Sequence, residues 1–444
     1  MKRGTSPRPV THALAAALLL AALLSTPAPA QSGRVILKTP APEPTPTPKA
    51  EGPKFVPDPK AEKYRLVFAT RYQGTFDYRD AEELALIRRS AFDNFVAEGL
   101  NKSGAEGYRV VTSLKGDPAV VALGGEQFEY AWTETASRDL FYKRGFAGIY
   151  SLLAKKGFRL ASHAFLYGYC QPLFPDRCDY RDFFLFERRK GDEAPREHTS
   201  VDTERGQQRR KDATREEALT DALNAKRAEG FYPAQFLSKS EIVLEREPPD
   251  PALAEASTEL RVARSSTFFE TDELPKKVNE LARQGYRLAL ADHEIAVLYR
   301  RAGQTAPLGY VWLKSSKKEF ERELARLQES GAVFRTTYPD ADGARKTLVF
   351  EQGPAGEAAR REYRVLRFEL QTREDASGQF LETSLAPASA DAQRELNRLA
   401  AEGFAVLALF DADKYKFTKP GNGREGIISE EFGVLLERKA EARP

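Results

Sequence analysis

The sequence predicts an α+β protein of six tandem strand-helix-strand-strand (βαββ) units, each a small antiparallel sheet with one helix on a face. Three observations predict it: a recurring helix-Gly-aromatic-strand phrase, an alternating strand ahead of the helix, and a short apolar run at the end of the unit. The composition of the 444 residues, 30% charged and 41% hydrophobic, is typical of a globular chain. It excludes a collagenous, wholly disordered or multi-span membrane protein.

Residues 1–30 have the pattern of a secretory signal peptide. The basic residues Lys2, Arg3 and Arg8 precede a twelve-residue apolar run over 13–24. Ala28, Pro29 and Ala30 follow the run as a cleavage site. Twelve apolar residues fall short of the roughly 20 that span a bilayer as a helix. We therefore expect a mature chain from Gln31 onward, located in the periplasm or secreted, with no transmembrane span.

Loss of the signal peptide changes the charge balance of the chain. It removes three basic residues, which lowers Lys+Arg from 68 to 65, equal to the 65 Asp+Glu. A chain with no net positive charge is a poor candidate for general nucleic-acid binding, because that affinity rests on neutralising phosphates. We expect no nucleic-acid partner.

Six glycines mark the repeat. Each follows an amphipathic helical stretch, and all but the fifth precede Tyr or Phe: Gly107, Gly157, Gly230, Gly285, Gly331 and Gly403. Glycine takes the left-handed conformation of a helix C-cap without steric cost, so we predict that these residues end the helices. In the fourth unit Leu274, Val278 and Leu281 share one helix face, as the spacing of an amphipathic helix requires.

The strands follow from alternation and apolar runs. Alternating segments such as YRLVFAT (64–70) and GYVWLK (309–314) precede the helices, and apolar runs such as FFLFERRK (183–190) and EIAVLYRR (294–301) end the units. A continuous apolar run is typical of a strand flanked on both sides, so we place the third strand between the first and second. No convincing first strand is found for the third unit.

The predicted domain boundaries follow from these patterns. Pro-rich and charged stretches give the linkers. The segments are a signal peptide (1–30), a Pro-rich linker (31–62), unit 1 (63–124), unit 2 with an inserted loop (125–190), a charged linker (191–213), a degenerate unit 3 (214–248), unit 4 (257–302), unit 5 (307–353) and unit 6 (361–440).

The helix, EG-aromatic, strand, turn and VLxER pattern, seen as AEGFAVLAL near Gly403 and VLLERK over 434–439, resembles a small bacterial domain family of unknown function. That family has a strand-helix-strand-strand fold and occurs alone or within exported proteins. The resemblance covers most of residues 63–440. It implies a fold, and it brings no catalytic residues, cofactor or known activity.

Residues that could carry chemistry are few and scattered. After signal removal the histidines are His163, His198 and His293, in a strand, the charged linker and a turn, so we expect no metal site, no cofactor and no nucleophile-base pair. The GNGREG segment (421–426) lacks the strand-to-helix context of a dinucleotide site. Asp340 and Asp342 lack the remaining ligands of a calcium loop and are predicted as turn residues, like Asp292, Asp411 and Asp413.

An aromatic loop in the second unit is the one candidate contact surface. Cys170 and Cys178 are the only cysteines, and such a pair in an exported chain predicts a disulfide across the loop. Tyr167, Tyr169 and Phe174 lie in or near it as candidate recognition residues, with structural packing as the alternative.

The sequence thus favours an exported, non-catalytic repeat protein that binds or scaffolds an unknown envelope protein or polymer. Two alternatives stay open. One is a hydrolase of cell-envelope material that uses carboxylates in a cleft between units, and the other is a carrier of lipid or envelope polymer.

Overall fold

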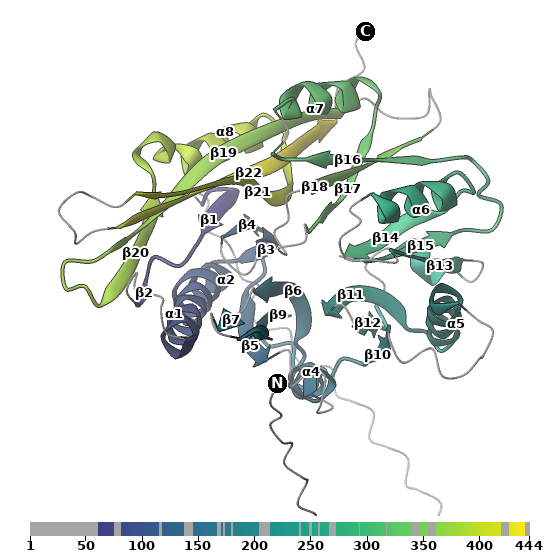
Figure 1. Cartoon of the computed structure of the whole chain (residues 1–444), viewed down its shortest axis with the longest axis horizontal. Helices are drawn as coiled ribbons and strands as arrows, with labels where there is room; N and C mark the ends of the chain where they lie inside the picture. Colours follow the sequence, from purple (N-terminus) through teal and green to yellow (C-terminus); the bar gives the residue numbers. More distant parts are fainter. Residues whose placement is uncertain are drawn as a thin grey trace, which may run out of the picture. The chain divides into compact units, whose positions relative to one another are not determined.

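The strands of this chain form several small antiparallel sheets, each with a helix nearby, which is an α+β architecture (Figure 1). The computed structural model describes residues 61–74, 81–114, 118–136, 145–166, 170–171, 174–178, 181–203, 214–238, 241–247, 251–255, 258–265, 272–292, 294–316, 318–339, 347–353, 361–418 and 426–439. All of them belong to one compact unit, Lys54–Pro444. No helix in these ranges is long and apolar enough to cross a membrane.

Five sheets have three strands in the same order, with the last strand of each trio in the middle. In spatial order they are β1 (Tyr64–Val67), β4 (Ala119–Leu123) and β3 (Tyr108–Ser113); β5 (Phe128–Ala136), β9 (Arg181–Arg189) and β6 (Arg159–Leu166); β10 (His198–Asp202), β12 (Glu241–Glu245) and β11 (Tyr232–Ser238); β13 (Glu259–Arg264), β15 (Ile295–Arg300) and β14 (Arg287–Asp292); β16 (Gly309–Lys314), β18 (Thr347–Gln352) and β17 (Val333–Tyr338).

The sixth main sheet has five strands, and the chain's first described segment contributes one of them. Its order is β2 (Arg71–Gln73), β20 (Phe380–Leu385), β19 (Arg361–Glu374), β22 (Ile427–Lys439) and β21 (Ala405–Thr418). The long strands β19, β21 and β22 stand out in Figure 1. A seventh, two-stranded sheet pairs β7 (Cys170–Gln171) with β8 (Phe174–Cys178).

The central strands are buried because their apolar runs have neighbours on both sides. In β15 all of Ile295–Tyr299 is buried, and in β18 so is Thr347–Glu351. The predicted central place of these runs is confirmed by the strand order of the described sheets.

Helices pack on these sheets through one apolar face. The buried residues of α6 are Leu274, Val278 and Ala282, at the spacing of one helix stripe. The helices are α1 (Ala81–Asn94), α2 (Lys102–Ala105), α4 (Gly145–Ala154), α5 (Arg215–Ala228), α6 (Glu273–Ala282), α7 (Phe320–Glu329) and α8 (Ala392–Ala401), with π-helix η1 (Phe95–Asn101) and 3-10 turns η3 (Pro251–Ala254) and η4 (Pro387–Ser389).

A glycine with positive φ follows the helix in every one of the six places where the phrase recurs. The φ values are +91° at Gly107, +82° at Gly157, +84° at Gly230, +87° at Gly285, +70° at Gly331 and +89° at Gly403. At Gly403 the chain forms a Schellman motif, since the Gly403 N–H donates to the Ala400 carbonyl and the Phe404 N–H to the Leu399 carbonyl. The chain then turns at once into β21.

Two sequence predictions are wrong. The charged linker, residues 191–213, contains strand β10, in which Val201 is buried and His198 pairs opposite Glu245. It was missed because a short polar edge strand with one buried apolar residue has no period-two pattern. Asp411 and Asp413 lie inside strand β21 and not in a turn, because β21 and β22 extend well past the length of the other pairs.

Candidate functional site

At four of the six boundaries between neighbouring sheets, an asparagine side chain on the helix of one sheet binds the edge strand of the next. Asn279 of α6 accepts a hydrogen bond from the Tyr310 N–H at 2.6 Å and donates one to the Tyr310 carbonyl at 3.0 Å. Asparagine matches the backbone of an edge strand in this way because its amide offers one acceptor and two donors. The same pair of bonds joins Asn101 to Tyr130, Asn224 to Leu260 and Asn397 to Tyr64.

A buried tyrosine completes this joint. The Tyr310 hydroxyl accepts a hydrogen bond from the Leu288 N–H at 2.7 Å, across the boundary between two sheets. Tyr130, Tyr363 and Tyr64 do the same with Val110, Phe334 and Val406. Burial raises the pKa of Tyr310, Tyr130 and Tyr363, so these hydroxyls stay protonated.

The amide and the tyrosine occur at fixed places in the phrase. Each of the four asparagines stands six residues before the glycine that ends its helix. Each N–H that donates to a tyrosine hydroxyl belongs to the residue three positions after a helix-ending glycine. Sequence reasoning missed both, although the recurring Asn and the Tyr of the alternating strands were a visible signal.

These joints run from each sheet to its successor and return from the last to the first. The remaining two links are Tyr150 to Glu245 and Tyr363 to Gln328. We call the whole series the contact cycle. It is closed by Asn397 of α8, which holds Tyr64 of β1, and by the pairing of β2 with β20.

Two buried glutamates reinforce the cycle. Glu187 is 4% exposed and accepts hydrogen bonds from Arg109 of the preceding sheet at 2.8 Å and Arg159 of its own sheet at 2.7 Å. Desolvation by burial raises the pKa of Glu187, and the Arg109 charge opposes that rise. In the same way Glu351 accepts from Arg335 at 2.7 Å and lies 3.7 Å from Arg287 of the preceding sheet.

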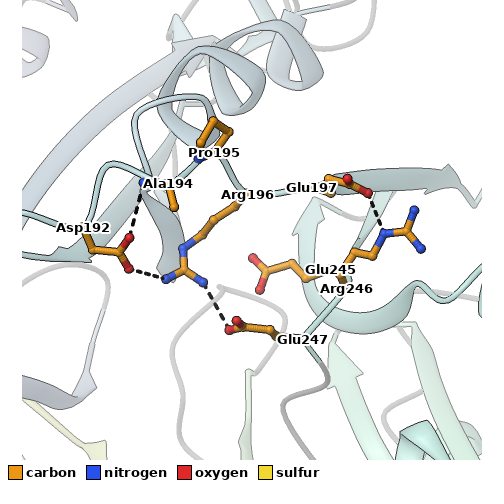
Figure 2. A pocket seen from close by; sticks show the side chains of 8 residues that line it. All are labelled: Asp192, Ala194, Pro195, Arg196, Glu197, Glu245, Arg246 and Glu247. Carbon is orange, nitrogen blue, oxygen red and sulfur yellow. Dashed lines mark hydrogen bonds and ion pairs between the residues drawn. The ribbon is translucent and has the colours of Figure 1, made fainter. Parts of the chain in front are cut away.

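A pocket between the second and third sheets is strongly charged (Figure 2). It has a volume of about 320 Å³ and is lined by Asp192, Ala194, Pro195, Arg196, Glu197, Glu245, Arg246 and Glu247. We call it the charged pocket. Its arginines are already paired, since Arg196 bonds to Glu247 at 3.1 Å and to Asp192 at 3.4 Å, while Arg246 bonds to Glu197 at 2.5 Å.

Glu245 is a half-buried carboxyl of the charged pocket. It accepts a hydrogen bond from the Tyr150 hydroxyl, and desolvation by burial raises its pKa. The Glu247 side chain beside it is 76% exposed. The pocket therefore brings one half-buried carboxyl close to the Arg196 guanidinium, while the carboxylates of Glu197 and Glu247 are exposed to solvent.

A second pocket is lined by one strand from each of the five three-stranded sheets. In each sheet this is the strand that comes second along the chain: β3, β6, β11, β14 and β17. It has a volume of about 260 Å³, and its surface is mostly polar. We call it the inner pocket. Its lining residues are Val111, Thr112, Ser113, Ala161, Ser162, Ala234, Gln235, Phe236, Leu290, Ala291, Asp292 and Thr336.

The residues singled out from the sequence are mostly not brought together here. Tyr167 and Tyr169 lie outside the described residues, as does the side chain of Phe174. The backbone places Cys170 directly opposite Cys178 in the β7–β8 pair, a separation that a disulfide accommodates, and the bridge stays a prediction. His198 packs edge-on against Tyr150 at 4.1 Å, and burial lowers its pKa.

Among the described residues there is no group of three or more His, Cys, Asp or Glu arranged to hold a metal ion. Comparison with known proteins finds no matching family model, no similar curated protein and no similar solved structure.

Proposed function

We propose that this chain is an exported binding or scaffolding protein built from six tandem βαββ units, related to the small bacterial domain family that its sequence resembles. The contact cycle supports the proposal. Four of its six joints use the same residue positions, which is what a chain of repeated units produces, since each unit covers the exposed face of its neighbour.

The cycle also supports a binding role over a catalytic one. The polar groups at the unit boundaries form hydrogen bonds that hold one unit to the next. The arginines of the charged pocket are paired with carboxylates of the same pocket. The inner pocket remains available to a ligand. Each unit except the last contributes one strand to its lining. Its mostly polar surface does not favour a lipid cargo.

The first experiment tests export. The protein is expressed from its full gene in a bacterial host, and the mature form is recovered from the periplasm and the medium. Mass spectrometry is expected to find an N-terminus at Gln31. A full-length product that stays in the cytoplasm would contradict the proposal.

The second experiment separates binding from catalysis. The mature protein is incubated with labelled, purified cell-envelope polymer, and both co-sedimentation and release of soluble label are measured. We expect co-sedimentation without release. Steady release of soluble fragments would contradict the non-catalytic proposal.

One observation favours a second candidate, a carboxylate-dependent hydrolase. Glu245 has a raised pKa beside Arg196 in the charged pocket, as a general acid would. If this candidate holds, Glu245→Gln abolishes the release of soluble label, while Glu193→Gln, at a 72% exposed side chain, does not. If any release survives Glu245→Gln, the hydrolase candidate is wrong.

A further inference from the structure

The five strands that line the inner pocket, and β21 of the last sheet, share one irregularity. In each of β3, β6, β11, β14, β17 and β21 the pairing register shifts at the residue four after the helix-ending glycine, and β11 and β21 each shift once more further along. The bulged residues are Val111, Ala161, Ala234, Ala289, Arg335 and Leu407.

A bulge bends its strand and redirects the side chains that follow it, and bulges are common beside binding and catalytic sites. The residues that follow these bulges include Thr112, Ser162, Gln235 and Thr336, all of which line the inner pocket. The repeated bulge therefore directs one polar side chain from each of four sheets into the same space.

The lining has the chemistry of a site for neutral polar groups. It holds the hydroxyls of Thr112, Ser113, Ser162 and Thr336, the amide of Gln235 and the carboxylate of Asp292. None of the described residues that line it is a lysine or an arginine. Hydroxyl and amide groups both donate and accept hydrogen bonds, which suits a ligand that is rich in hydroxyl groups.

Part of this bonding capacity is not used within the protein. The Thr112 hydroxyl accepts a hydrogen bond from the Leu409 N–H at 3.1 Å, and no described residue accepts its own hydrogen. Ser113 donates to Ser162 at 3.0 Å, which leaves the Ser162 hydrogen available. Among the described residues, none forms a hydrogen bond with the Gln235 side chain.

The size and apolar contacts of the pocket narrow the ligand further. About 260 Å³ is below the usual range for drug-sized ligands, roughly 300–1,000 Å³, so the pocket fits a smaller molecule. Val111 is 41% exposed and presents an apolar surface in the same lining.

We propose that the inner pocket binds a small, uncharged polyhydroxyl molecule of the size of a monosaccharide. The hydroxyl and amide side chains after the bulges hydrogen-bond its hydroxyl groups, and Val111 contacts its C–H face. This proposal rests on the proposed binding function, to which it adds the class of ligand and the residues that recognise it.

Isothermal titration calorimetry with D-glucose and N-acetyl-D-glucosamine tests the proposal, with glucose 6-phosphate as the charged probe. We expect at least one neutral sugar to bind and the phosphate ester to bind more weakly. Gln235→Leu and Ser162→Ala should each weaken binding by about tenfold, the effect of losing roughly 1.4 kcal/mol of hydrogen bonding.

Gln284→Leu is the matched control, because it makes the same chemical change at an exposed site outside the pocket and should leave binding unchanged. Thermal melting of each variant checks that it folds, and Thr336→Val serves if one of the two pocket variants does not. Equal binding by folded pocket variants and wild type would overturn the site. Stronger binding of the phosphate ester, or no binding of either neutral sugar, would overturn the ligand class.

Failure here is distinguishable from failure of the proposed function. Co-sedimentation with envelope polymer without release of label, together with no binding of neutral sugar, would retain the binding function and overturn the inner pocket as a sugar site.

Discussion

Glu187 shows how a single buried side chain couples the fold to pH. Its carboxylate lies at the boundary of two sheets between Arg109 and Arg159. Burial opposes ionisation and the guanidinium groups favour it, and the desolvation effect is the larger of the two. The folded protein therefore binds a proton at Glu187 more readily than the unfolded chain does.

The first prediction concerns the pH dependence of stability. Because the folded pKa of Glu187 lies above its usual value of 4.5, the contribution of this group to the free energy of unfolding is greatest below pH 4.5. It is lost as the pH rises through the folded pKa. Relative to Glu187→Gln, which cannot ionise, the wild type should thus lose stability in urea titrations as the pH rises above 4.5.

Asp375 supplies a control of opposite sign. Hydrogen bonds from Ser377 and, with a smaller effect, from Arg71 lower the pKa of Asp375 to about 2 from the usual 3.8. Its contribution is present above pH 3.8 and is lost as the pH falls through about 2. The wild type should therefore gain stability relative to Asp375→Asn as the pH rises from 2 to 4. The same slope for both variants would contradict the assignment.

At the scale of the element, the glycine at the end of a helix marks where the next strand begins. Gly285 follows α6 with φ +87°, and a Cβ there would lie 2.6 Å from the Gln304 carbonyl oxygen. Gly303 also has a positive φ, +79°, but a Cβ there would have no neighbour within 4 Å. An added Cβ would therefore cause backbone strain at both glycines, but a steric clash only at Gly285.

The second prediction uses this pair. Gly303→Ala should lower the free energy of unfolding by about 1–2 kcal/mol through the left-handed conformation alone. Gly285→Ala should cost about 1–3 kcal/mol more, since the Gln304 backbone must also move. Chemical denaturation of both variants checks this, and equal losses would show that the close contact at Gly285 does not matter.

Sequence patterns gave the helices, the central strands and the glycines, because each depends on local periodicity or on a residue with special backbone freedom. Strand β10 could not be predicted, because Val201 is its only buried residue. What otherwise holds the strand in place is its backbone pairing with β12, which leaves no pattern in the sequence. The bulges and the inner pocket were also missed. A register shift depends on the partner strand, and a pocket lined by five strands depends on how distant segments pack.

At the scale of the whole molecule, the contact cycle makes the two ends of the folded chain interdependent. The Asn397 amide bonds to Tyr64 across 333 residues of sequence with distances of 2.9 Å, while Asn279 bonds to Tyr310 across 31 residues with 2.6 and 3.0 Å. The closing joint and an internal joint therefore use the same chemistry.

The third prediction compares these two joints. If the cycle is one cooperative unit, Asn397→Ala and Asn279→Ala should each lower the global free energy of unfolding by about 2–4 kcal/mol, since each leaves two backbone groups unpaired. Urea denaturation followed by circular dichroism measures both. If Asn397→Ala left the global transition unchanged and only speeded amide exchange in β1 and α8, the ends would be separate from the rest.

The pairing of β2 with β20 and of β1 with α8 has a consequence for biogenesis. The first two strands of the described residues, β1 and β2, have partners that are synthesised more than 300 residues later, as the 333-residue separation between Tyr64 and Asn397 requires. Such non-local pairing makes folding slow, because the chain must close a long loop before it gains the contact. Until then the apolar faces of Tyr64 and Leu66 stay uncovered, so a newborn chain needs protection from aggregation until its last sheet is complete.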